Sequence, residues 1–83
     1  MRRYQTAFNR EALNFAVQVD NAVFGEIELW VNLIERAPAT RGDYTEEDDD
    51  GRELQVVVLR TVAITYWTDD AAGEVGVVGI ESL

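Results

Sequence analysis

The chain of 83 residues has no cysteine, no histidine and no lysine, and it has a single proline, Pro38. Disulfides, thiolate or imidazole metal sites and imidazole catalysis are therefore excluded. No apolar run approaches the roughly 18–20 residues of a membrane-spanning helix. The N-terminal residues 1–4 lead into no signal-peptide core. We expect a cytoplasmic protein that makes no membrane contact and needs no cofactor and no metal.

Positive charge is also scarce, because seven arginines face sixteen acidic residues and leave a net charge of −9. The acids are concentrated in residues 43–53, where seven of them accompany one arginine, Arg52. Such an excess of negative charge repels nucleic-acid phosphates at long range, so direct nucleic-acid binding is disfavoured. The hydrophobic content of 47% is typical of a globular domain, which we expect to span residues 1–83.

The first half of the chain predicts one strand followed by two helices. Residues 3–8 alternate in character, and Asn9 is a suitable N-cap for a short helix over residues 10–19. Asp20 gives a second capping signal, and the apolar residues beyond it recur at helical spacing: Val23, Ile27, Trp30, Ile34 and Ala37. Pro38 ends this second helix, because proline cannot donate a backbone hydrogen bond.

The second half is dominated by three apolar, β-branched runs, at residues 54–59, 62–67 and 75–80. The short breaks between them predict hairpins. Asp50-Gly51 is a strong turn dipeptide, which would pair a short strand starting at Tyr44 with the first run. This order predicts an α+β fold, with a small antiparallel sheet of three to five strands and two N-terminal helices packed on one face.

Both faces of the predicted sheet carry apolar side chains, so we expect a partner chain or a second copy to cover the open face. The candidate contact residues are Tyr66, Trp67, Val57 and Leu59. Two alternatives remain for Tyr66 and Trp67. They could stack on a nucleic-acid base, or they could fill a core, which is the favoured interpretation for aromatic residues on a central strand.

The acidic loop fails the test for a calcium-binding EF-hand. Aligned on Gly51, its twelfth position is Val57, where a bidentate glutamate is required. A solvated loop is therefore favoured over a cation site. The remaining candidates for chemistry are three arginines that could contact phosphate or neutralise nearby acids: Arg41, Arg52 and Arg60.

Three stretches resemble the RelE/ParE superfamily of toxins from bacterial toxin–antitoxin pairs. They are the helix end at residues 31–38, the loop with Arg41-Gly42 and the turn at residues 50–52, and the hairpin over residues 63–81. The resemblance implies a compact α+β domain whose partner is a cognate antitoxin. It further implies a target such as the ribosome, on which some members cleave mRNA, or DNA gyrase, which others inhibit.

The chain departs from the pattern of the nucleolytic members of that family. Where active members have lysine or arginine within the strand after the turn, this chain has Gln55, Val56, Val57 and Val58. Gly76 and Gly79 stand where many members have a basic residue. The C-terminal Glu81-Ser82-Leu83 supplies no tyrosine, histidine or arginine. We therefore expect a weak or non-nucleolytic toxin-family protein that acts through protein contact. If it is an enzyme, it is an mRNA endoribonuclease whose catalytic residues we cannot assign.

A second hypothesis belongs to a different class. The acidic residues 43–53 would suit a small interaction protein, carried by a phage or plasmid, that mimics nucleic acid and blocks a basic groove.

Overall fold

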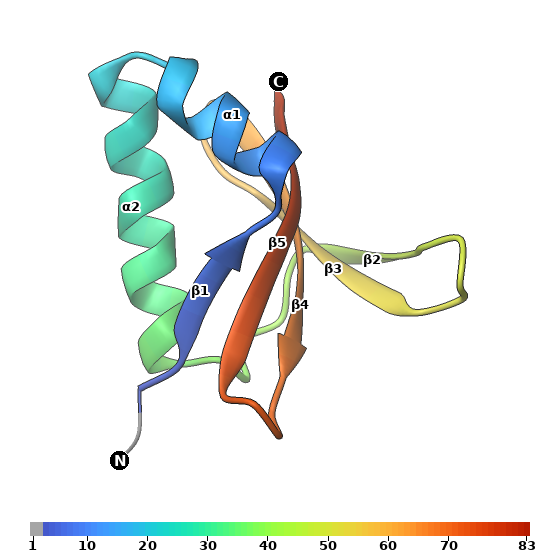
Figure 1. Cartoon of the computed structure of the whole chain (residues 1–83). Helices are drawn as coiled ribbons and strands as arrows, with labels where there is room; N and C mark the ends of the chain where they lie inside the picture. The colour runs from blue at the N-terminus through green and yellow to red at the C-terminus, as the bar shows by residue number, and fades with distance from the viewer. Residues whose placement is uncertain (1–2) are drawn as a thin grey trace.

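The computed structural model describes residues 3–83, and within them two helices and five strands, so that Met1 and Arg2 lie outside the described part. In chain order the elements are β1 (Gln5–Phe8), α1 (Arg10–Gln18), α2 (Asn21–Arg36), β2 (Tyr44–Glu47), β3 (Glu53–Val58), β4 (Val62–Asp69) and β5 (Glu74–Ser82) (Figure 1). The strands form one sheet in the order β1-β5-β4-β3-β2. The expected α+β class is confirmed.

Both helices begin at the predicted caps. The side chain of Asn9 accepts a hydrogen bond from the backbone N–H of Ala12 at 2.9 Å, and that of Asp20 accepts one from Val23 at 3.0 Å. Each bond satisfies a backbone donor that the first turn of a helix leaves without a partner. The second helix ends at Arg36, two residues before Pro38. Neither helix in the described residues is long and apolar enough to cross a membrane.

The pairing of the strands confirms the predicted hairpins and corrects one edge of the sheet. The pairs β2–β3, β3–β4 and β4–β5 are antiparallel, as expected. In contrast β1 lies parallel to β5, with Gln5 opposite Glu74 and Phe8 opposite Val77. The sheet is therefore mixed and not wholly antiparallel. The chain leaves β1 through two helices, so no hairpin fixes the direction of β1 against its neighbour.

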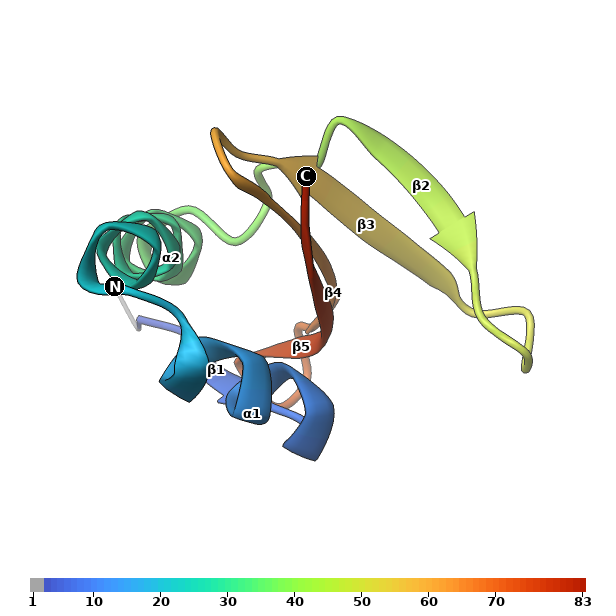
Figure 2. The same cartoon turned by 90° about the horizontal axis from the view of Figure 1, so that it is seen from above.

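The main core lies between the two helices and one face of the sheet, which we call the helix face. The helices contribute Ala12, Ile27, Trp30 and Ile34, and the sheet contributes Val62, Ile64, Tyr66, Val75, Val77 and Ile80. The alternation along β4 sets this division, because every second residue of a strand points to the same face. Figure 2 shows both helices on the side of the sheet away from the β2–β3 hairpin.

A bulge keeps β5 in phase with the core. Thr65 of β4 lies opposite Gly79, but the next residue, Tyr66, lies opposite Val77, so Val78 is an extra residue in β5. Without it, Val77 and Ile80 would point to opposite faces. The bulge allows both to pack in the same core.

The other face of the sheet, which we call the outer face, has a small apolar region of its own. In the register of β3 and β4, Val57 lies opposite Ile64 on the helix face, so the alternating residues Leu54 and Val56 point outward. Both are buried all the same. Val56 has Tyr44 of β2 on one side and Thr65 of β4 on the other. A partner chain is therefore not needed to bury these two side chains.

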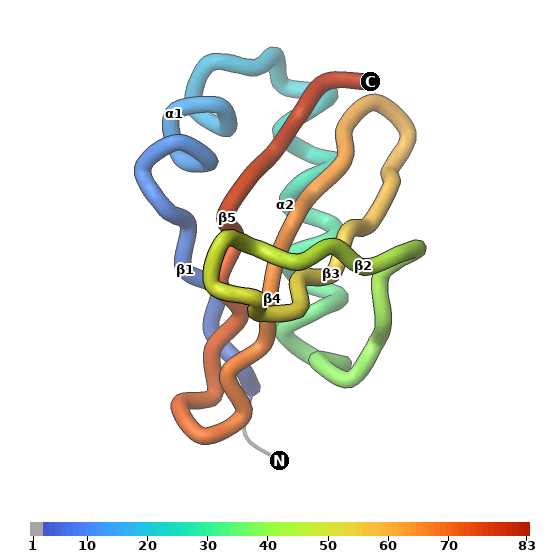
Figure 3. Tube along the Cα trace, turned by 90° about the vertical axis from the view of Figure 1, so that its right-hand side faces the viewer, coloured from blue at the N-terminus to red at the C-terminus, as the bar shows by residue number. Residues whose placement is uncertain are grey.

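The β2–β3 hairpin projects from the rest of the molecule, as Figures 1 and 2 show, and in Figure 3 it points toward the viewer in front of β4 and β5. Its tip is the acidic turn, where Gly51 adopts a positive φ of 79° that favours glycine. The other end of the hairpin is fixed by a close backbone approach. A Cβ on Gly42 would lie 2.5 Å from the carbonyl oxygen of Val56, which accepts a hydrogen bond from the N–H of Asp43 at 2.7 Å.

Candidate functional site

The three candidate arginines do not converge on one site. Arg52 precedes β3 and Arg60 follows it, and a strand of that length holds them about 20 Å apart. Arg41 lies in the loop before β2, with its Nη2 3.9 Å from Oε1 of Glu53 in an exposed pair. Each arginine therefore lies in its own local environment, and no common phosphate cradle forms from the three.

Arg52 and Trp67 meet on the outer face, although the sequence analysis considered them for separate roles. The guanidinium carbon of Arg52 lies 4.5 Å from the centroid of the Trp67 ring, within the range of a cation–π contact. The indole also lies against Gly76, where a Cβ would come within 2.6 Å of its Nε1. The ring is therefore held between Gly76 and Arg52. A nucleic-acid base could stack on Trp67 only after displacing Arg52.

Asp48 holds Arg52 in this position and organises the acidic turn. Its Oδ1 accepts hydrogen bonds from the backbone N–H groups of Asp50 and Arg52 at 3.0 and 2.8 Å, and its Oδ2 accepts one from Arg52 Nε at 2.9 Å. These bonds, with the backbone bond of Arg52 first, hold the pKa of Asp48 below its ordinary value. The carboxylate that the EF-hand alignment tested as a ligand therefore has a structural role. Within residues 3–83, no group of three or more acidic residues is arranged to hold a metal ion.

Tyr66 belongs to the main core. It is 1% exposed, its ring makes an edge contact with Trp30 at a centroid distance of 5.0 Å, and its hydroxyl donates to the carbonyl oxygen of Thr40 at 3.2 Å. Burial raises the pKa of its hydroxyl. A side chain this deeply buried offers no surface to a partner, so its assignment as a contact residue is corrected in favour of the core. Val57 and Leu59 are partly buried and pack against the same core.

Arg60 lies beside an acidic side chain of α2. Glu26 accepts two hydrogen bonds from Thr61, one from its backbone N–H at 2.9 Å and one from its hydroxyl at 3.0 Å. The backbone bond is the main reason that the pKa of Glu26 is lowered, and the positive charge of Arg60 acts in the same direction. These contacts fasten the β3–β4 link to α2. Arg60 favours the ionised form of Glu26, which is consistent with a role in balancing local charge.

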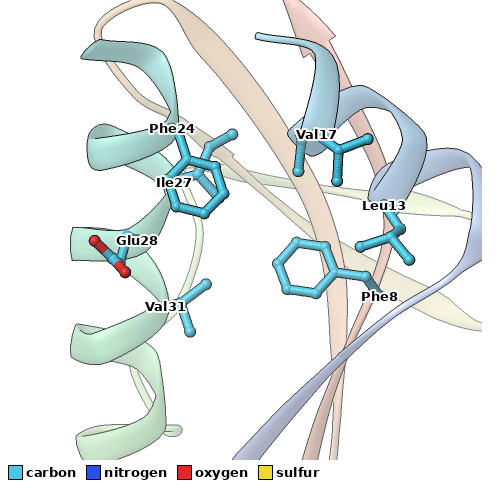
Figure 4. A pocket seen from close by; sticks show the side chains of 8 residues that line it. Phe8, Leu13, Val17, Phe24, Ile27, Glu28 and Val31 are labelled. Carbon is cyan, nitrogen blue, oxygen red and sulfur yellow. The ribbon is translucent and has the colours of Figure 1, made fainter. Parts of the chain in front are cut away.

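An apolar groove lies between the two helices. We call it the α1–α2 groove; it has a volume of about 260 Å³, and its floor contains Ala16 and Ile27. Figure 4 shows the side chains that line it, which include Phe8, Leu13, Val17, Phe24, Glu28 and Val31. This groove was not predicted from the sequence. Leu13, Val17 and Phe24 are large apolar residues, but only the structure shows that they lie outside the main core.

Comparison with known proteins identifies the fold. No protein-family model matches the sequence, and a search of curated proteins finds no match. Among solved structures, the chain is similar to a chain of the toxin–antitoxin complex RelBE2 from Mycobacterium tuberculosis, with a TM-score of 0.75 and 12% sequence identity. The alignment covers 98% of this chain and 99% of that chain. The chain has a RelE-type fold.

Within this RelE-type fold, the structure brings together two of the residues that the sequence analysis selected, Arg52 and Trp67. It pairs Arg41 with Glu53 at 3.9 Å, and at a separate position the charge of Arg60 acts on Glu26. The apolar α1–α2 groove lies between the helices, away from the sheet residues proposed as partner contacts.

Proposed function

We propose that the protein is the toxin-like member of a toxin–antitoxin pair, that it acts by contact with an antitoxin or a cellular target, and that it has weak or no nuclease activity. The RelE-type fold supports the first part, because the similar chain comes from a complex of a toxin with an antitoxin. The local sequence features of that family point in the same direction.

The separation and pairing of the candidate arginines carry the second part of the proposal. Cleavage of RNA requires several positively charged or hydrogen-bonding groups to converge on the charge that develops at phosphorus. It also requires an acid and a base with suitable pKa values. Here Arg41 pairs with Glu53, Arg52 pairs with Asp48 and covers Trp67, and Arg60 lies near Glu26. This arrangement favours structural roles for all three.

The direct test is a cleavage assay with purified protein and mRNA on translating ribosomes. We expect no cleavage above the level of a buffer control. Cleavage that Arg52→Ala or Arg60→Ala abolishes, while Arg36→Ala retains it, would overturn the non-nucleolytic part. A supercoiling assay with DNA gyrase tests the other target that the resemblance suggests.

The toxin–antitoxin assignment has an independent test in the neighbouring gene. We expect an adjacent open reading frame to encode a small protein that co-purifies with this chain after co-expression and reverses any growth arrest. Absence of both binding and growth arrest would contradict the assignment.

A second function, as an acidic nucleic-acid mimic, is supported by the projecting hairpin. Glu46, Glu47, Asp49 and Asp50 are exposed on it or at its tip, whereas Asp48 is engaged in the turn. If these four residues bind a basic groove, replacing them with the corresponding amides will abolish binding, and affinity will fall steeply with salt. Asp48 must stay unchanged, so that the hairpin keeps its fold. Binding that survives both the substitutions and high salt would exclude the mimic.

A further inference from the structure

The dimensions of the α1–α2 groove indicate the kind of ligand that it accepts. Its volume of about 260 Å³ lies below the roughly 300–1,000 Å³ that is typical of sites for drug-sized molecules. The lining is apolar apart from Glu28. Such a groove suits one or two anchoring side chains of a larger partner better than it suits a whole metabolite.

Large apolar side chains on both walls of the groove remain exposed to solvent in the folded chain. Leu13, Val17 and Phe24 are large apolar side chains on its two walls, and Val17 is 67% exposed. None of the three belongs to the main core. Leu13 and Val17 lie one turn apart on α1 and face Phe24 of α2 (Figure 4). Neighbouring exposed apolar residues that line one groove favour an interaction site more than isolated exposed apolar residues do.

Because the groove lies between two helices, a helix is a more suitable occupant than a β-strand. The backbone of each wall is hydrogen-bonded within its own helix, so the walls offer few donors or acceptors to an added strand. A helix satisfies its own backbone groups and needs only apolar side chains at spacings of three and four residues to fill a groove.

The negative charge of this chain indicates that the polar face of the docking helix is cationic. The chain carries a net charge of −9, and the one ionisable residue lining the groove is an acid, Glu28. A negative field attracts a cationic segment during diffusion, and unlike charges next to an apolar contact fix its orientation. An acidic segment would meet repulsion both at long range and at Glu28.

We propose, building on the function proposed above, that the partner docks in the α1–α2 groove through a cationic amphipathic helix. Its apolar residues contact Leu13, Val17 and Phe24, and a lysine or arginine beside them pairs with Glu28. The partner of this toxin-like chain is therefore basic where it docks.

The test uses the full chain and two synthetic helical peptides that share the same leucine face. One peptide carries lysines on its polar face, and the other carries glutamates at the same positions. Fluorescence anisotropy of the labelled peptides gives each Kd. We expect the lysine peptide to bind at least about tenfold more tightly than the glutamate peptide, since like charges oppose the latter.

Two matched variants separate docking in the groove from general charge attraction. Val17→Asp puts a carboxylate on the apolar wall, and Leu29→Asp adds the same charge to an exposed position on the opposite side of α2, where Leu29 is 74% exposed. We expect Val17→Asp to weaken the lysine peptide about tenfold, the size of a lost interface anchor. Leu29→Asp should leave binding unchanged, and Glu28→Lys should weaken it about fivefold.

Each alternative outcome would overturn the inference. Equal binding of the lysine peptide to both aspartate variants would mean general attraction, and preference for the glutamate peptide would reverse the charge assignment. If neither peptide binds and Val17→Asp converts a dimer to a monomer in sedimentation, the groove serves a second copy. The peptide result is independent of the neighbouring gene. A failed co-purification would therefore remove the proposed function without deciding what the groove binds, and a failed peptide assay would leave the antitoxin to bind elsewhere.

Discussion

Tyr66 and Trp67 are adjacent in β4, yet they lie in two different environments. Tyr66 points into the main core, where its ring contacts Trp30 at a centroid distance of 5.0 Å and its hydroxyl bonds to Thr40. Trp67 points to the outer face, where it lies between Gly76 and the guanidinium of Arg52. The two helices close the helix face with apolar side chains. A single arginine, 47% exposed and held by Asp48, covers Trp67.

The two aromatic side chains differ in the free energy needed to expose them to solvent. Uncovering Tyr66 would require α2 to separate from the sheet and expose several buried apolar side chains, each worth about 1.5–3 kcal/mol. Uncovering Trp67 requires only that Arg52 rotate away. The outer face can therefore change its surface without unfolding, whereas the helix face cannot.

The largest effect that we predict is on the helix face. Ile64→Ala removes a side chain that is fully buried in the main core, and we expect a loss of about 2–5 kcal/mol in the free energy of unfolding. Urea denaturation followed by circular dichroism measures it. Val58→Ala is the control, because Val58 is exposed near the edge of the outer face. Similar losses in the free energy of unfolding for the two variants would contradict the assignment of Ile64 to the buried core and of Val58 to the exposed outer face.

Gly76→Ala should have the next largest effect, because its Cβ would lie 2.6 Å from Trp67 Nε1 and displace the ring. Forcing extra volume into a packed site costs about 1–3 kcal/mol. The matched control is Gly79→Ala on the same strand, where the nearest atom to a Cβ is that of Thr65 at 3.9 Å. Urea denaturation compares the two. If Gly79→Ala proves as destabilising as Gly76→Ala, the close approach of Trp67 is not the cause.

Arg52→Ala should have a smaller effect on stability but a clear one on Trp67. A cation–π contact at an exposed site is worth about 0.5–1 kcal/mol. Loss of the guanidinium should also expose the indole, so we expect a red shift of tryptophan emission and stronger quenching by iodide. Arg41→Ala, which breaks only the exposed pair with Glu53, should leave both unchanged. An unaltered emission spectrum in Arg52→Ala would mean that Arg52 does not cover Trp67.

The smallest expected effect is a dependence of stability on acid pH. The pKa of Asp48 and that of Glu26 are lowered in the folded chain by their hydrogen bonds. The unfolded chain therefore takes up these protons first as the pH falls. Their contribution is complete above their ordinary pKa values and is lost as the pH drops through the lower folded values. The urea midpoint should fall less steeply with acid in Asp48→Asn than in Asp49→Asn, which leaves the Asp48 bonds in place. Equal slopes would contradict this role for Asp48.

Much of the fold follows from local patterns in the sequence. Asn9 and Asp20 mark the helix starts, Pro38 follows the helix end, and Asp50-Gly51 marks a turn, because each acts through backbone groups within a few residues of itself. The direction of β1 and the bulge at Val78 could not be read in this way. Both depend on pairing between segments that are far apart in the chain.

The candidate site was less predictable than the fold. Arg52 and Trp67 were both candidates from the sequence, but for separate roles, and their contact depends on the hairpin bringing residue 52 over β4. Tyr66 could be separated from Trp67 by alternation alone, although which of the two faced the helices was open. The α1–α2 groove went unnoticed, because its walls come from two helices whose mutual angle no local pattern specifies.

By itself the sequence determined which segments are helices and which are strands, and it determined the negative charge of the whole molecule. These properties depend on residue type and on spacing along the chain. Only the tertiary structure decided that Arg52 covers Trp67, that β1 runs parallel to β5, and that Leu13, Val17 and Phe24 face one another across a groove. The physical reason is that each of these contacts joins residues whose neighbourhood exists only after the sheet and both helices have packed together.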